Sequence, residues 1–227
     1  MTEFQRARSA EQKCRRVEQI KGAAGELFEQ HPYHQITLTT IAERLGWSRA
    51  NLYKYVRTKE EIFLLIMADL RDAYTADLLD AMASLPTPED AAAAWTDVCC
   101  RHRRYFRYAD LLFTVIETNV SVEALMAFKR GYYEHLDETN TRLSHALGVP
   151  AERCEELANT IYHHAVGLSG SCLNNPLVRE AVAQLGVVRE PVDFGAQMAD
   201  FIWQRPAAAH RPLPQSPSSV SARPGRL

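Results

Sequence analysis

The sequence contains no apolar run long enough to cross a lipid bilayer. The longest such run, from Ile62 to Ala68, has seven residues, whereas a transmembrane helix needs about 20. The chain opens with Met1 to Arg6 and continues into polar residues, without the hydrophobic segment of a secretory signal. We therefore expect a cytoplasmic protein with no membrane partner.

Cysteine is also scarce. The five cysteines are widely spread and none belongs to a Cys-x-x-Cys pair: Cys14, Cys99, Cys100, Cys154 and Cys172. Disulfide frameworks and structural zinc sites need closer, regular spacing, and a reducing compartment keeps thiols reduced. Cys99 and His102 are spaced as half of a metal site, but no second half accompanies them. We expect neither a metal nor a cofactor.

The composition that remains is that of a globular protein. The chain has 227 residues, 46% of them hydrophobic and 24% charged, which allows one or two domains. The formal charge of −2 divides into +4 over residues 1–60, −9 over 61–205 and +3 over 206–227. A basic N-terminal part is typical of a protein that meets a polyanion; chance clustering of surface charge is the alternative.

Every long segment has helical periodicity, which predicts an all-α fold. The expected helices cover residues 11–30, 38–45, 49–56, 58 to about 85, 88–108, 121–147, 151–172 and 192–204. Residues 113–122 locally prefer a strand, but a lone strand would leave its backbone groups unpaired, so we expect helix there. From Pro206 onward the composition predicts a disordered tail.

Residues 37–56 have the pattern of a helix-turn-helix. Ile41, Ala42 and Leu45 form the inner side of the first short helix, Gly46 supplies the turn, and Ser48 is a good N-cap for the second helix. The side chains left facing outward on the second helix are Arg49, Ala50, Asn51, Lys54 and Tyr55. A helix with such a face fits the major groove of DNA.

This motif resembles the TetR (tetracycline-repressor-like) family of bacterial one-component regulators. The residues that carry the resemblance are Thr37…Ile41-Ala42, Gly46-Trp47-Ser48, Leu52-Tyr53-Lys54-Tyr55-Val56 and Thr58-Lys59-Glu60. Trp47, Asn51 and Val56-Arg57 depart from the family's usual residues. We expect Asn51 to change which bases are preferred, since an asparagine side chain pairs with adenine.

The resemblance implies a set of DNA contacts. Arg49, Ala50 and Asn51 match the positions that touch base edges, and others match phosphate contacts. The implied set is Thr37, Thr39, Ser48, Arg49, Ala50, Asn51, Tyr53, Lys54, Tyr55 and Lys59. The alternatives are core packing for Tyr53 and a merely solvated Arg49. The basic residues between Arg6 and Arg16 either touch the DNA backbone or minor groove, or form a mobile solvated tail.

A dimer is expected because one helix-turn-helix reads too few base pairs for genomic specificity. The resemblance implies that the last two long helices pair with their twins in a four-helix bundle. The interface candidates are Leu157, Ile161, Ala165, Leu168, Met198, Phe201 and Ile202. The alternative is that these residues pack only inside one subunit.

The resemblance also implies an effector pocket among the middle helices. The candidate lining residues are Trp95, Phe106, Phe113, Tyr132, Tyr133 and His163; the alternative for each is an ordinary core position. The basic run from Arg101 to Arg107 suggests an anionic effector, but a solvated face with acidic partners is favoured. His163 and His164 diverge on a helix and do not form a chelating pair.

The sequence thus predicts a dimeric DNA-binding regulator, a repressor that releases a palindromic operator when a small-molecule effector binds. Its expected domains are a DNA-binding domain at 11–60, an effector-binding and dimerisation domain at 61–205, and a tail at 206–227. No catalytic motif appears, so we do not expect an enzyme. The alternative function, a helical enzyme acting on an apolar small molecule, depends only on the aromatic and histidine content of residues 95–164.

Overall fold

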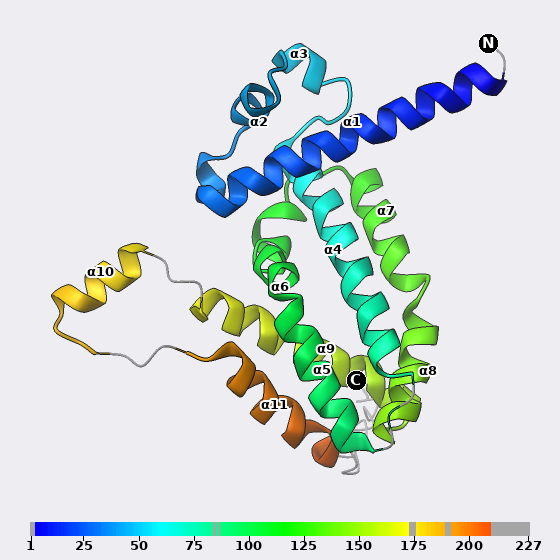
Figure 1. Ribbon diagram of the computed structural model, residues 1–227, viewed down its shortest axis with the longest axis vertical. Coiled ribbons are helices and arrows are strands. Elements are labelled where there is room, and N and C mark those ends of the chain that lie inside the picture. The colour runs from blue at the N-terminus through cyan, green and yellow to red at the C-terminus, as the bar shows by residue number, and fades with distance from the viewer. Residues whose placement is uncertain (1–2, 84, 86, 173–175, 189–191, 210–227) are drawn as a thin grey trace, which may run out of the picture.

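The computed structural model describes residues 3–83, 85, 87–172, 176–188 and 192–209, and within them every regular element is helical (Figure 1). This confirms the all-α prediction. The elements are α1 (Glu3–Gln30), the 3-10 turn η1 (Tyr33–Gln35), α2 (Leu38–Leu45), α3 (Arg49–Leu52), α4 (Lys59–Ala81), α5 (Pro88–Arg101), α6 (Arg103–Ala109), the π-helical turn η2 (Leu112–Ile116), α7 (Val122–Tyr133), α8 (Leu136–Leu147), α9 (Ala151–Cys172), α10 (Pro176–Gln184) and α11 (Phe194–Ala209).

Local capping signals start several of these helices where the sequence places them. The side chains of Ser48, Thr58 and Thr87 each accept a hydrogen bond from the backbone N–H three residues further on. Such caps satisfy donors that have no partner inside the helix. Gly46 ends α2 with a φ of 66°, a left-handed conformation in which a Cβ would be strained.

The three N-terminal helices form a small unit at one end of the molecule (Figure 1). Helix α4 leaves this unit and runs into the body, where it packs against α5, α6, α7 and α8, while α11 packs against α5 and α9. Buried aromatic rings join the two parts: the centroid of Phe63 on α4 lies 5.3 Å from that of Phe28 on α1 and 5.6 Å from that of Tyr108 on α6.

Two predicted helices are each broken in two, and others have different ends, among them α4, which ends at Ala81 rather than near residue 85. The expected helix 88–108 stops at Arg101, because His102 has a φ of −101° and a ψ of 27° and its ring is held by Asp77 of α4. The expected helix 121–147 breaks at residues 134–135. Helix α1 begins at Glu3 rather than at residue 11, and α3 ends at Leu52.

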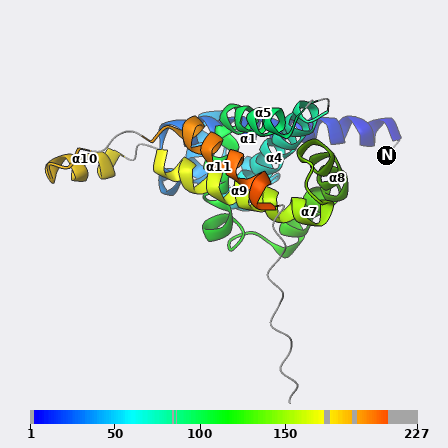
Figure 2. The same cartoon turned by 90° about the horizontal axis from the view of Figure 1, so that it is seen from below.

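The C-terminal third also differs from the prediction. Pro176 begins a further helix, α10, because proline suits the first turn of a helix; α10 stands apart from the other helices in both views (Figures 1 and 2). Helix α11 continues to Ala209, past the predicted start of the tail. The remaining tail, residues 210–227, lies outside the described residues.

The β-branched segment 113–122 is not a strand, but the expected helix forms only in part: η2 ends at Ile116, and turns and bends follow until α7 begins at Val122. In the described part of the chain, no helix is both long and apolar enough to span a membrane.

Candidate functional site

The helix-turn-helix owes its geometry to short-range contacts. The Thr37 hydroxyl accepts from the N–H of Thr40 at 3.1 Å, and the Thr40 hydroxyl accepts from the N–H of Thr37 at 3.0 Å, a reciprocal cap at the start of α2. After Gly46, the N–H of Trp47 donates to the carbonyl of Ala42 at 2.8 Å. These contacts fix the direction in which the chain enters α3.

Of the side chains predicted to face outward near α3, Arg49, Ala50 and Lys54 are exposed, whereas Asn51 and Tyr55 are half-buried. Leu52 is only 1% exposed and anchors the inner side, while Ser48 caps the helix through the N–H of Asn51. Six of the ten predicted DNA-contact residues are exposed: Thr37, Ser48, Arg49, Ala50, Tyr53 and Lys54. The Tyr53 side chain is 47% exposed. The half-buried ones are Thr39, Asn51, Tyr55 and Lys59.

Arg49 and Tyr53 form a pair on this face. An Nη of Arg49 donates to the Tyr53 hydroxyl at 3.0 Å, and the guanidinium carbon lies 5.7 Å from the ring centroid. Cation–π contacts of this kind stabilise exposed pairs modestly. The pair therefore orients Arg49 without burying its charge.

Trp47 connects the turn to α1. The guanidinium carbon of Arg16, on α1, lies 4.8 Å from the Trp47 ring centroid. The ring centroid of Tyr55, just after α3, lies 6.0 Å from that of Trp47. A small aliphatic residue at position 47 would lack both contacts. This departure from the family's usual residue thus adds packing between α1 and the helix-turn-helix.

Lys59 is engaged at the start of α4. Its ammonium donates to the carbonyls of Tyr33 at 3.0 Å and Ile36 at 2.9 Å, and it lies 3.9 Å from the Tyr33 ring centroid. Burial lowers the pKa of Lys59 from its ordinary value. Two of its three N–H donors are used inside the protein, and its phosphate contact stays a prediction.

A cavity of about 600 Å³ lies in the body, within the usual range for small-molecule sites. Helices α4, α5, α7, α8 and α9 contribute to its wall, together with Tyr105 of α6 and the turn η2. Five of the six predicted lining residues border it: Trp95, Phe113, Tyr132, Tyr133 and His163. Phe106 does not, because its ring is fully buried between Tyr74 and Phe194.

The sequence interpretation missed the charged group of this cavity. Arg71 is a lining residue and only 8% exposed. The residues that border the cavity repeat at helical spacing as Met67, Arg71, Tyr74 and Leu78, so an arginine on that stripe was the available signal.

Tyrosine hydroxyls supply further polarity to the wall. The indole N–H of Trp95 donates to the Tyr74 hydroxyl at 2.8 Å, and the Tyr74 and Tyr105 rings stack at 5.1 Å. Burial raises the pKa of Tyr74, Tyr105 and Tyr162, so these hydroxyls remain neutral donors and acceptors.

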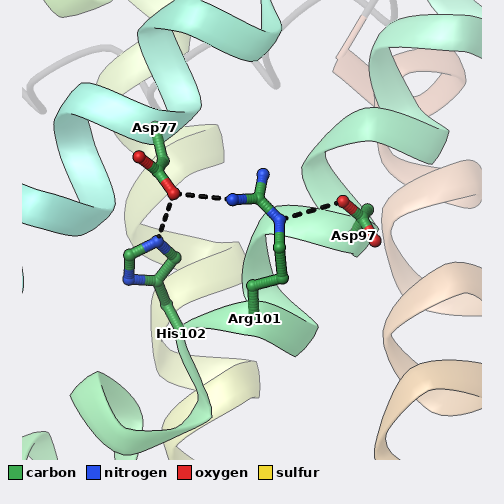
Figure 3. Close-up of polar contacts among 4 residues, drawn as sticks. All are labelled: Asp77, Asp97, Arg101 and His102. Carbon is green, nitrogen blue, oxygen red and sulfur yellow. Dashed lines mark hydrogen bonds and ion pairs between the residues drawn. The ribbon is translucent and has the colours of Figure 1, made fainter.

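The basic run 101–107 is paired with acidic groups, as favoured from the sequence. Arg101 bonds Asp97 and Asp77, and His102 Nε2 lies 2.8 Å from Asp77 Oδ2, so this cluster joins α4 to α5 (Figure 3). These hydrogen bonds, first that of His102, hold the pKa of Asp77 below its ordinary value. Arg107 donates to Glu29 at 2.6 Å and to the Phe28 carbonyl at 2.7 Å, which connects α6 to α1.

No three His, Cys, Asp or Glu side chains gather as a metal site in the part of the chain that the structure describes. Burial raises the pKa of the Cys99 thiol to about 12, and the neighbouring His102 ring is bonded to Asp77.

Most of the predicted dimer residues lie inside the subunit. The buried ones are Leu157, Ile161, Ala165, Met198 and Ile202. They lie between α9, α11 and their neighbours within the subunit. Leu168 and Phe201 are half-buried, and the Phe201 ring stacks on His164 at 3.6 Å. The large apolar side chains exposed in this part of the chain are Val178, Leu185, Val187, Val188, Val192 and Trp203.

Two family descriptions match the chain. Residues 20–66 match the bacterial regulatory proteins of the tetR family, and residues 66–204 match the tetracyclin repressor-like C-terminal domain. Together they include the helix-turn-helix and the body with its cavity.

Solved structures share the fold. A transcriptional regulator of the TetR/AcrR family from Thermobifida fusca YX-ER1 aligns with a TM-score of 0.55 at 20% identity, over 87% of this chain and 99% of that one. The fatty acid degradation regulator FadR from Bacillus halodurans aligns with a TM-score of 0.55 at 15% identity, over 84% of this chain and 93% of that one. A TetR transcriptional regulator from Rhodococcus sp. RHA1 aligns with a TM-score of 0.50 at 19% identity, over 90% of this chain and 100% of that one. Among curated proteins, nothing matches significantly.

Proposed function

Because the chain belongs to the TetR family of transcriptional regulators, we propose that it is a homodimeric repressor that releases a palindromic operator when a small molecule fills its cavity. The family membership confirms the resemblance carried by residues 37–60. The observation that carries the proposal is the course of α4: it starts at Lys59 beside the DNA-binding unit and borders the cavity from Met67 to Leu79.

The exposed face of α3 supports DNA reading. Arg49 and Asn51 lie in its first turn, where an arginine can grip guanine and an asparagine adenine. Tyr53, Lys54 and Thr37 surround them with phosphate-binding groups. A repressor bound to the chromosome works in the cytoplasm, and we place the protein there.

The second subunit is proposed to dock on the exposed apolar residues between α9 and the end of α11. Leu185, Val188 and Trp203 are 77%, 95% and 59% exposed. Large apolar side chains left in water in one stretch of chain mark an interaction surface. A two-fold dimer would bring two α3 helices to two operator half-sites.

Coupling between cavity and DNA is proposed to run through two contacts of the N-terminal unit. One is α4 itself, and the other is the Arg107–Glu29 ion pair between α6 and α1. A ligand that shifts α4 or α6 changes the spacing of the two α3 helices. A coupling of ~1–3 kcal/mol changes affinity several-fold to about hundredfold.

TetR-family regulators are generally not enzymes, and we propose that this protein is not one. The most buried thiol near the cavity, Cys99, is kept protonated by a pKa of about 12, which makes it a poor nucleophile.

A band-shift titration tests the function. The full-length protein is titrated against the DNA upstream of its own coding region, at several salt concentrations, beside scrambled DNA of equal length. We expect a palindromic footprint and an affinity that falls steeply with salt, because phosphate contacts release counterions. Equal affinity for the scrambled DNA would contradict the proposal.

A further inference from the structure

Arg71 stands out among the ionisable groups of the body. Among the described residues it is the only charged side chain that is buried. It lies on α4 facing α7, where an Nη donates to the Phe128 carbonyl at 2.8 Å and the guanidinium lies 4.9 Å from the Phe128 ring centroid. Burying a charge in this way destabilises the folded protein unless the charge is paired.

The pairing of Arg71 inside the protein is incomplete. Its Nε and one Nη donate to a single oxygen of Asp72, at 2.9 and 2.7 Å. The Asp72 side chain is 62% exposed, so much of its charge is compensated by water. Together with the Phe128 contact, these bonds use three of the five N–H donors of a guanidinium. Two N–H donors of the guanidinium are left over from these contacts, on a side chain that borders the cavity.

A glycine on α7 makes room for this arrangement. A Cβ on Gly131 would lie 2.6 Å from an Nη of Arg71 and 3.5 Å from its guanidinium carbon. Any other residue at position 131 would push the guanidinium aside. Gly131 therefore acts as a positioning residue for Arg71.

The rest of the cavity wall determines which ligand suits this charge. Its acidic lining residues, Asp72 and Glu155, are exposed, and its other cation, Lys129, is ion-paired with Glu117. The remaining wall is mainly apolar and aromatic, including Met67, Trp95 and other rings. A cationic ligand would meet the buried guanidinium with no buried carboxylate to offset it.

The wall also contains an unsatisfied polar atom. Oδ1 of Asn140 is buried and has no hydrogen-bond partner among the described residues, and Asn140 borders the cavity. Buried polar atoms are normally paired. Oδ1 is an acceptor, so it would pair with a hydrogen-bond donor on an occupant, separate from the acid group that Arg71 would bind.

We propose that the effector is an amphiphilic organic anion: an apolar body within the aromatic wall, and one carboxylate or similar acid group bound by Arg71. This inference depends on the proposed function only in calling the ligand an effector. Arginine suits the role because its planar fork binds a carboxylate through two N–H groups.

Matched probes test the charge preference on the full-length protein without DNA. Decanoate is compared with decanamide and decyltrimethylammonium, and 2-naphthylacetate with its amide, by calorimetric titration and thermal shift. At least one of the two acids should bind ten times more tightly than its own amide, and the ammonium probe should bind more weakly than decanoate. Equal or tighter binding of the amides or the ammonium probe, or no saturable binding of either acid, overturns the proposal.

Variants assign the preference to Arg71. Arg71→Met keeps a long side chain and should reduce the acid-over-amide preference below twofold, while amide binding changes little. The control Arg130→Met makes the same substitution on α7 at an exposed position outside the lining and should preserve the preference. A folded Arg71→Met protein with the wild-type preference overturns the assignment.

Gly131→Ala provides a second route in case Arg71→Met does not fold. Alanine favours a helix more than glycine, so the variant should fold, while the new Cβ displaces the guanidinium. We expect acid binding to weaken three- to tenfold with amide binding unchanged. Unchanged acid binding in this variant contradicts the proposed position of Arg71.

The operator titration separates this inference from the proposed function. If the acids bind through Arg71 but no DNA is bound or released, the ligand class stands and the repressor function fails. If the protein binds a specific operator but binds the acids no more tightly than their amides, the proposed function stands and the proposed ligand class fails.

Discussion

The DNA-binding unit and the cavity each contain an arginine to which we assign a role, and the two are held in opposite ways. Arg49 is exposed on α3 and is oriented by its own helix neighbour Tyr53. Arg71 is buried, and its contacts come from Asp72 beside it and from α7, 57 residues further along the chain. The comparison shows that the polar face at α3 is made by one short stretch of sequence, whereas the cavity needs several helices at once.

The largest expected effect is on the contact that joins the two regions. Phe63→Ala removes a fully buried ring that packs against Phe28 and Tyr108. We expect the free energy of unfolding to fall by ~3–5 kcal/mol, as for other large-to-small core substitutions. Urea unfolding measures it, with Phe113→Ala as the control, since Phe113 is exposed. Similar losses in both variants would show that the junction is not tightly packed.

The next prediction separates the two regions. Arg49→Ala should weaken operator binding by ~1–3 kcal/mol and relax the preference at one base pair per half-site. Binding of decanoate should not change, because Arg49 lies outside the cavity. Band shifts with operator variants measure the effect, and Arg142→Ala on the exposed surface of α8 is the control. An equal loss on every DNA sequence would mean that Arg49 contacts only phosphate.

A third prediction concerns the proposed dimer. Leu185→Glu places a charge on the exposed apolar segment and should weaken dimerisation at least tenfold, about 1.4 kcal/mol. Sedimentation at several concentrations measures this. Val122→Glu introduces the same charge at an exposed apolar position on α7 and should leave the dimer intact. If only the control dissociates, the interface lies on α7.

The smallest effect is expected at Asn140. Asn140→Leu replaces an unsatisfied buried polar atom by an apolar group and should stabilise the free protein by about 1 kcal/mol. Thermal unfolding without ligand measures it. Asn159→Leu is a comparison at another polar lining residue, one without a buried unpaired atom. A destabilised Asn140→Leu protein would show that Asn140 has a structural role in the wall.

The success of the sequence interpretation differs between the regions for a physical reason. Caps at Ser48, Thr58 and Thr87 and the turn at Gly46 depend on neighbours within a few residues, so the pattern predicts them. The break at His102 depends on Asp77, which is 25 residues away. No local signal indicates such a break.

The same reason explains the interface candidates and Arg71. Apolar stripes on α9 and α11 predict burial, but periodicity does not say whether a face is covered by the same subunit or by a second one. Ile161 and Met198 are covered within the subunit. Arg71 was missed because a charge on an apolar stripe is ordinarily assigned to the solvated side of a helix.

The sequence by itself determined the helical class, the helix-turn-helix and the outward face of α3, since each depends on hydrogen bonds and periodicity within one short segment. Only the tertiary structure decided where the cavity lies, that a guanidinium is buried in its wall, and which apolar faces remain exposed. These properties arise when distant helices exclude water together, and that exclusion cannot be assigned to any one segment alone.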